Sequence, residues 1–231
     1  MLIEWLILIP CIILSYWASS NVNRTFDRYS KQLSVRHLTG AEAAQRVLMA
    51  NGVTGVRIER IAGNLTDHYD PKSNVIRLSD SVYDNCSTAA IGVACHEAGH
   101  AVQYATNYAP IKLRAAIIPV TNFGSKLAMP LIFLGVALTT MSYHFYSLVY
   151  LGIICFSLAL IFQLVTLPVE FNASSRALQA IENCAILTSS ELVGAKKTLR
   201  AAAMTYVAAT AVSVGQLIRL LYLFGGRRRR N

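Results

Sequence analysis

Two histidines four residues apart, His96 and His100, are the side chains of this chain that are best spaced to act together. On a helix both imidazoles face the same side and can bind one metal ion. Glu97 lies about 100° further round the helix than His96, so its carboxylate reaches a water molecule on the metal rather than the metal. The pattern predicts a zinc site in which Glu97 is the general base that activates a zinc-bound water for peptide hydrolysis.

The residues around this motif predict the helix that the spacing requires. Ser87 is a suitable N-cap, and the segment 107–110 is a suitable stop. Nearly every face of the helix is apolar or small, so we expect it to be buried, with Gly92 and Gly99 allowing another backbone to come close. Three polar groups on such a helix need a partner, and a metal ion is the simplest one.

A catalytic zinc site usually has three protein ligands, so a third is expected besides the two histidines of the motif. The candidates are His37, His68 and Glu170. Pro168 predicts that a new helix begins just before Glu170, which would give that carboxylate a fixed direction. The spacing alone leaves these candidates open.

Three segments carry a resemblance to a known family. They are 67–71 (Asp-His-Tyr-Asp-Pro), 91–101 around the histidine motif, and 167–174 (Leu-Pro-Val-Glu-Phe-Asn-Ala-Ser). Through them the chain resembles the YugP-like neutral zinc metallopeptidases of bacteria over nearly its full length. It is more distantly similar to the HtpX-type membrane proteases, which are gluzincins.

The resemblance implies that His96, His100 and Glu170 are the ligands of one Zn²⁺ per chain, with Glu97 as the base. The second motif of the HtpX-type proteases has an aspartate where this chain has Ser174. A serine can orient a ligand histidine by a hydrogen bond, but it carries no charge.

Two further polar side chains are candidates for contacts with a substrate. His68 precedes a predicted turn at 70–74 and could polarise the scissile carbonyl or stabilise the oxyanion, although an ordinary surface turn is the alternative interpretation. Arg176 could pair with a substrate carboxylate or with a nearby aspartate. The sequence does not separate these two roles of Arg176.

The composition indicates a membrane protein. Of the 231 residues 54% are hydrophobic, which is more than a soluble domain usually contains. The excess is clustered in four runs, at 2–17, 127–143, 145–167 and 201–224, and runs of about 17–25 such residues can cross a bilayer. We interpret the first run as a retained anchor and the next two as a transmembrane hairpin. The last run contains polar residues, and it is a span, an interfacial helix or a helix packed on the others.

The distribution of charge predicts an orientation. Basic residues follow the first run directly, at 24–36, and the turn of the hairpin around 142–144 has no charged residue. Since positive charges stay on the cytoplasmic side, the chain returns to the cytoplasm before Glu170, and the site faces the cytoplasm of a multi-pass protein of the cell membrane.

The net charge of +9 is explained by the same arrangement, because the basic residues flank apolar runs. The expected partners are therefore the lipid bilayer, which the arginines 227–230 would contact, and a peptide or membrane-protein substrate, with no nucleic acid. The oligomeric state is not predicted. Five cysteines without paired spacing indicate a reducing compartment.

The predicted fold is that of a mainly α membrane protein, with a zincin-like metal helix and a small β-hairpin or short sheet. A capping box at Thr39 opens a helix through Ala50, and strands are expected at 53–61 and 75–79. We expect 75–79 to be a sheet edge that pairs with an extended substrate, with an ordinary hairpin as the alternative.

Five regions follow from these features. They are an anchor (1–20), a cytosolic zincin-like region (21–114), an amphipathic segment with the transmembrane hairpin (115–167), a cytosolic helical region with the third ligand (168–200), and a hydrophobic helix with a basic tail (201–231).

The predicted function is that of a membrane-bound zinc-dependent endopeptidase. Two alternatives stay open, namely a membrane adaptor that holds zinc without turnover and an intramembrane metalloprotease. The hydrophobic hairpin contains no acidic residue that could supply the third ligand of an intramembrane site, which disfavours the second alternative.

Overall fold

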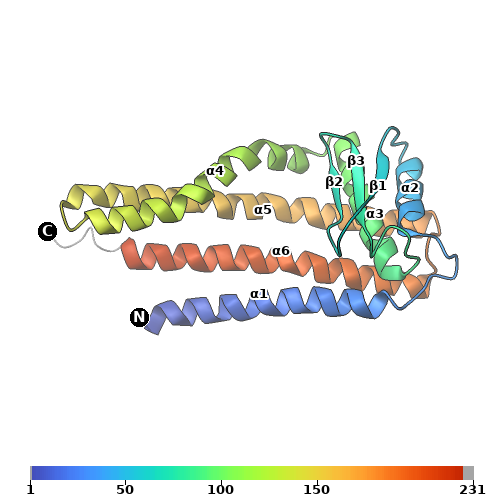
Figure 1. Ribbon diagram of the computed structural model, residues 1–231, viewed down its shortest axis with the longest axis horizontal. Coiled ribbons are helices and arrows are strands. Elements are labelled where there is room, and N and C mark those ends of the chain that lie inside the picture. Colours follow the sequence, from blue (N-terminus) through green and yellow to red (C-terminus); the bar gives the residue numbers. More distant parts are fainter. Residues whose placement is uncertain (1, 226–231) are drawn as a thin grey trace. The chain divides into compact units, whose positions relative to one another are not determined.

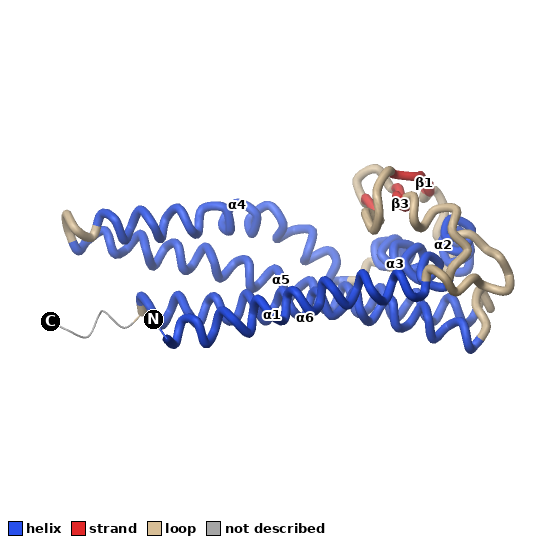
Figure 2. Tube along the Cα trace, turned by 60° about the horizontal axis from the view of Figure 1, so that its bottom comes forward, coloured by secondary structure: helices blue, strands red, loops and turns tan. Residues whose placement is uncertain are grey.

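A computed structural model describes residues 2–225, and it describes the side chains of residues 5–225. The protein is mostly helical with one small sheet (Figures 1 and 2). Its elements in chain order are α1 (Leu2–Tyr29), α2 (Gly40–Ala50), β1 (Arg57–Ile61), β2 (His68–Asp70), β3 (Val75–Ser79), α3 (Thr88–Ala105), α4 (Ala109–Leu138), the short 3₁₀ helix η1 (Tyr143–Phe145), α5 (Tyr146–Asn183) and α6 (Ser189–Phe224). This arrangement confirms the predicted fold class.

The chain forms two compact units. One, here called the helical unit, comprises 2–17, 113–167 and 206–225 of the described residues, and the other, here called the sheet unit, comprises 18–112 and 168–205. Helices α1, α4, α5 and α6 each contribute residues to both units.

Four helices within the described part of the chain are long and apolar enough to cross a membrane. They lie at Trp5–Tyr29, Ala109–Leu138, Tyr143–Asn183 and Ser189–Phe224. The runs predicted as an anchor and a hairpin overlap the first three of them. The run at 201–224 lies in α6, and the role of that run stays a prediction. The arginines 227–230, which we expect to contact lipid, lie outside the described residues.

Helix α5 corrects one expectation. Pro168 was expected to begin a new helix, but α5 continues from Tyr146 to Asn183 through this residue. A proline removes one backbone donor inside a helix, and long apolar helices tolerate this loss because neighbouring groups satisfy the freed carbonyl. Glu170 therefore takes its direction from the middle of a long helix.

The sheet corrects a second expectation. Its strand order is β1-β3-β2, with β1 parallel and β2 antiparallel to β3. The prediction that 75–79 is a sheet edge is therefore wrong, because β3 pairs on both sides. The burial of Val75, Ile76 and Leu78 is typical of a central strand. The edges are β1 and β2, and the segment expected as a turn from residue 70 begins only after β2 ends.

Helix α2 begins as predicted. The Thr39 side chain accepts a hydrogen bond from the Glu42 amide, and the Glu42 carboxylate accepts one from the Thr39 amide. This reciprocal capping box confirms the predicted start, and Ala50 is the last helical residue, as expected. Gly52 follows with a φ of 67°, a left-handed conformation that glycine adopts without strain.

Candidate metal centre

Helix α3 carries the histidine motif and lies in the core of the sheet unit. The Ser87 side chain accepts a hydrogen bond from the Ala90 amide, which confirms the predicted N-cap. The helix ends at Ala105, two residues before the predicted stop begins. Most of its residues are buried, so its few polar side chains must find partners inside the protein.

Gly99 sets the distance between α3 and α5. A Cβ atom at this position would lie only 2.6 Å from the carbonyl oxygen of Ala173. The two helices therefore approach almost backbone to backbone, as the glycine predicted. This close approach brings the middle of α5 beside the histidines of α3.

Three potential ligands meet where the helices approach. The ligand atoms of His96, His100 and Glu170 all lie within 4.8 Å of one another, and among the residues that the structure describes no other group of three has this property. The Oε2 atom of Glu170 lies 3.3 Å from Nε2 of His96 and 3.6 Å from Nε2 of His100. Glu170 is only 2% exposed.

The other ring nitrogens of the two histidines contact different side chains. Nδ1 of His96 lies 3.1 Å from Oγ of Ser174, and Nδ1 of His100 lies 3.0 Å from Oε1 of Gln103. Each histidine is thus anchored through Nδ1 and directs Nε2 towards Glu170. This is the arrangement that histidine ligands of a metal usually show, with the second nitrogen oriented by a further partner.

A zinc ion fits these residues. Two ligands about 2.0–2.1 Å from zinc at a tetrahedral angle are roughly 3.4 Å apart. The two distances from Glu170 to the histidines, 3.3 and 3.6 Å, agree with this value. Two imidazoles and one carboxylate are also the donor types of catalytic zinc sites with three protein ligands.

Negative charge surrounds the site. Burial alone would lower the pKa of His100, but the hydrogen bond that the protonated ring donates to Glu170, together with the charges of Glu97 and Glu170, outweighs burial, so the pKa lies above its ordinary value. This environment favours a cation between the three side chains.

Asp67 interacts electrostatically with Glu97 in the sheet unit. Glu97 is 8% exposed and follows His96 on α3. Burial raises the pKa of Asp67, and the charge of Glu97 raises it further, although hydrogen bonds from the amide and hydroxyl of Ser79 oppose the shift. Sequence analysis named Asp67 only as part of the segment 67–71 and assigned it no role.

The other histidines considered as third ligands are not part of the ligand group. His68 is exposed on the edge strand β2, with Nδ1 2.9 Å from the carbonyl oxygen of Thr66. His37 is exposed in a loop with a φ of 51°, and its carbonyl accepts a hydrogen bond from the thiol of Cys86.

Arg176 is held by neighbours in the sheet unit. Its Nε donates a hydrogen bond of 2.8 Å to Oδ1 of Asn172, and its guanidinium lies 5.8 Å from the centroid of the Tyr108 ring. The substrate contact expected of Arg176 stays a prediction.

Gln103 is the residue beside the site that sequence analysis did not identify. It is fully buried and donates hydrogen bonds to the Val169 carbonyl and to Asn172, besides its contact with His100. Its signal was available, because a residue three positions after His100 shares a helix face with it, and a buried amide needs partners.

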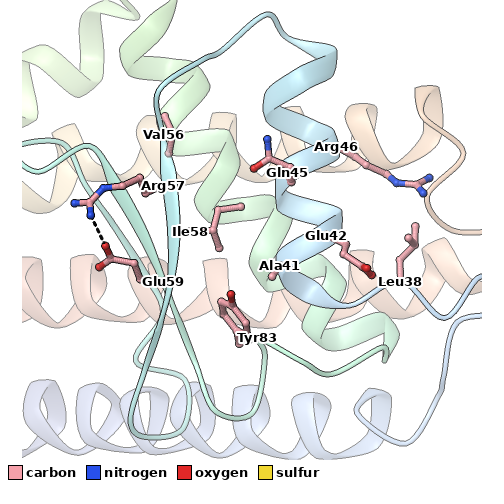
Figure 3. Close-up of a pocket in the computed structure, with 10 residues that line it drawn as sticks. All are labelled: Leu38, Ala41, Glu42, Gln45, Arg46, Val56, Arg57, Ile58, Glu59 and Tyr83. Atoms are coloured by element: carbon pink, nitrogen blue, oxygen red, sulfur yellow. Dashed lines mark ion pairs between the residues drawn. The ribbon is translucent and has the colours of Figure 1, made fainter.

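A hollow of about 740 Å³ lies elsewhere in the sheet unit, between α2 and β1 (Figure 3). Its apolar side includes Val56 and Ile58, and an ion pair of 2.9 Å joins Arg57 to Glu59 beside it. None of the candidate site residues lines this hollow.

Comparison with known proteins gives a consistent picture. Residues 4–225 match the model of a family described as "Putative neutral zinc metallopeptidase". The chain is 49% identical over 211 residues to the protein of Bacillus subtilis (strain 168) named "Putative membrane protease YugP". The aligned region covers 91% of this chain and 92% of the relative. No solved structure matches the chain.

Proposed function

Because the chain belongs to the neutral zinc metallopeptidase family, we propose that it is a membrane-bound zinc endopeptidase that hydrolyses peptide bonds with Glu97 as general base. The family implies zinc. The relative's name and the four apolar helices support the assignment of the chain as a membrane protein. The substrate would be a peptide or a membrane protein.

The single observation that carries this proposal is the geometry of the three ligand candidates. His96, His100 and Glu170 would hold one zinc ion per chain, and the two distances from Glu170 to the histidines suit a tetrahedral site. A zinc ion bound there would polarise a peptide carbonyl and lower the pKa of a water molecule.

The protein's own side chains would perform the proton transfers. Glu97 would accept a proton from the attacking water and then donate it to the leaving amine. Ser174 and Gln103 would keep the histidine rings in position through their contacts with the Nδ1 atoms.

His68 is the proposed contact to the substrate. It lies on β2, an edge strand, and the residue before it, Asp67, interacts electrostatically with Glu97. This interaction supports the proposal that β2 begins close to Glu97, the proposed general base. Since Nδ1 of His68 faces the carbonyl oxygen of Thr66, a substrate carbonyl could accept a hydrogen bond from Nε2 in the doubly protonated form of this ring.

The active site would face the cytoplasm. The basic residues at 24–36 favour this side for the segment that follows α1, and the three ligand candidates all belong to the sheet unit. Their place in this unit, rather than in the helical unit, also supports a site outside the bilayer over an intramembrane protease.

The test compares Glu97→Gln with the wild type in detergent. The variant should keep its zinc and lose cleavage of a solubilised membrane-protein substrate or a peptide library by a factor of at least about 10². Glu182→Gln, an equal change at an exposed position of α5, is the matched control and should cleave normally. Unchanged cleavage in the Glu97 variant would contradict the proposed role, and a wild type that binds zinc without cleaving any substrate would favour the adaptor.

A further inference from the structure

Arg176 begins a series of polar contacts whose direction is fixed. Its guanidinium contains only donors, and Nε donates to the side chain of Asn172 at 2.8 Å. The atom of Asn172 that faces Arg176 must therefore be its oxygen, since an amide nitrogen there would oppose a second donor.

Asn172 in turn fixes the side chain of Gln103. The Gln103 amide group lies 3.0 Å from the same oxygen of Asn172 and 2.8 Å from the carbonyl oxygen of Val169. Both atoms only accept hydrogen bonds in this arrangement, so the group that faces them is the amide nitrogen of Gln103. Two acceptors on different parts of α5 thus determine the same orientation.

The opposite end of Gln103 then determines the tautomer of His100. With its nitrogen turned to α5, Gln103 presents Oε1 to Nδ1 of His100 at 3.0 Å. An amide oxygen only accepts, so Nδ1 must carry the proton, and in the neutral ring Nε2 has a free lone pair. Gln103 is fully buried, which prevents bulk water from replacing this contact.

The second histidine lacks such a fixed direction. Nδ1 of His96 contacts the hydroxyl of Ser174, which can either donate or accept. The contrast shows that the tautomer of His100 is determined by protein groups, whereas Ser174 can adapt to either tautomer of His96.

We propose that Arg176, Asn172 and Gln103 form a directed chain of hydrogen bonds that places the proton of His100 on Nδ1 and so prepares its Nε2 to bind the metal. Gln103 and Arg176 are positioning residues in this proposal, because they act through His100 and do not touch the reacting atoms. The inference rests on the proposed function only for the identity of the metal.

The first experiment measures zinc affinity by competition with a chelator at constant pH. Gln103→Met should weaken zinc binding by about 10-fold to 100-fold. Gln179→Met, the same change at an exposed position of α5, should bind zinc like the wild type. Thermal unfolding of the zinc-free proteins separates a loss of folding from a loss of affinity. Wild-type affinity in a folded Gln103→Met protein would overturn the proposal.

The second experiment tests the direction of the chain. Arg176→Met should weaken zinc binding less than Gln103→Met does, and Arg176→Lys, which keeps a donor, should restore part of the affinity. Arg46→Met, an equal change at an exposed position of α2, is the control. In the Gln103→Met background Arg176→Met should have no further effect, because its influence passes through Gln103. Additive losses would contradict a chain.

Nitrogen NMR of the zinc-free protein reports on the tautomer itself. The ring of neutral His100 should carry its proton on Nδ1 in the wild type and become a mixture of tautomers in Gln103→Met. This measurement involves no zinc and no substrate, so it distinguishes a failure of this inference from a failure of the proposed peptidase. A wild-type ring protonated on Nε2 would overturn the inference.

Discussion

The two halves of α5 place side chains in very different surroundings. In the helical unit, 146–167, the helix exposes large apolar side chains such as Ile154 and Leu164, which are 62% and 52% exposed. In the sheet unit, 168–183, it buries a carboxylate, Glu170, among the histidines of another helix. Exposed apolar side chains show which part of the helix faces lipid. Buried polar side chains that contact another helix show where a functional site can form.

The largest expected effect compares two buried polar residues one turn apart on α5. Glu170→Gln should weaken zinc binding by more than about 100-fold, because an amide is a poor replacement for a carboxylate ligand. Thr166→Val should leave zinc binding unchanged, since Oγ1 of Thr166 makes no hydrogen bond among the described residues. Zinc content after dialysis, measured by mass spectrometry, checks both. Equal zinc contents of the two variants would contradict the claim that only the half of α5 in the sheet unit contributes a metal ligand.

The next effect compares two glycines at helix contacts. Gly99→Ala should destabilise the protein by about 1–3 kcal/mol and weaken zinc binding, because the new Cβ would meet the backbone carbonyl of Ala173 at 2.6 Å. In the helical unit, Gly124→Ala would meet Cδ1 of Leu158 at 2.5 Å, and this flexible end can rotate away. It should cost less than about 1 kcal/mol, with zinc affinity unchanged. Thermal unfolding in detergent measures both, and a greater loss in Gly124→Ala would contradict this account of the close approach.

A smaller effect is expected at the contact of His96. Ser174→Ala should weaken zinc binding by about 10-fold or less, because one neutral hydrogen bond is lost at a partly exposed ring. Ser175→Ala, at an exposed position one residue further along α5, is the control. Chelator competition measures both. A loss greater than that of Gln103→Met would show that the serine contact matters more than the directed chain.

The smallest effect lies in the sheet unit away from the metal. Hydrogen bonds from the Ser73 hydroxyl and the Lys72 amide hold the pKa of Asp70 well below its ordinary value. The ionised Asp70 carboxylate therefore stabilises the folded protein fully above about pH 4, and this contribution is lost as the pH falls further. Asp70→Asn should lower the melting temperature at neutral pH, and this difference should shrink below about pH 4, with zinc affinity unchanged. Asp27→Asn, at an exposed position of α1, should show no such pH dependence.

The sequence predicts features that depend on neighbours along the chain. The caps at Thr39 and Ser87, the helix of the histidine motif and the apolar runs all follow from local patterns, and the structure contains them. The resemblance to a family added Glu170, which spacing alone left undecided. The structure now places this carboxylate beside both histidines.

Features that depend on distant pairing could not be predicted in this way. The central position of β3 results from its parallel pairing with β1, which precedes β2 in the chain, and no local pattern specifies this order. The contact of Gln103 with Val169 and Asn172 likewise requires α3 and α5 to be neighbours. The proline rule failed at Pro168 because the packing of a long helix outweighed a local preference.

X-ray absorption spectroscopy of the purified protein, combined with metal analysis, tests the central claim most directly. We expect about one zinc per chain with four light ligands, of which two are imidazoles, at about 2.0–2.1 Å. Glu170→Gln should deplete the metal, and the matched Glu182→Gln should retain the same spectrum. A zinc bound by sulfur, or a wild-type spectrum with fewer than two imidazoles, would contradict a metal centre formed by His96, His100 and Glu170.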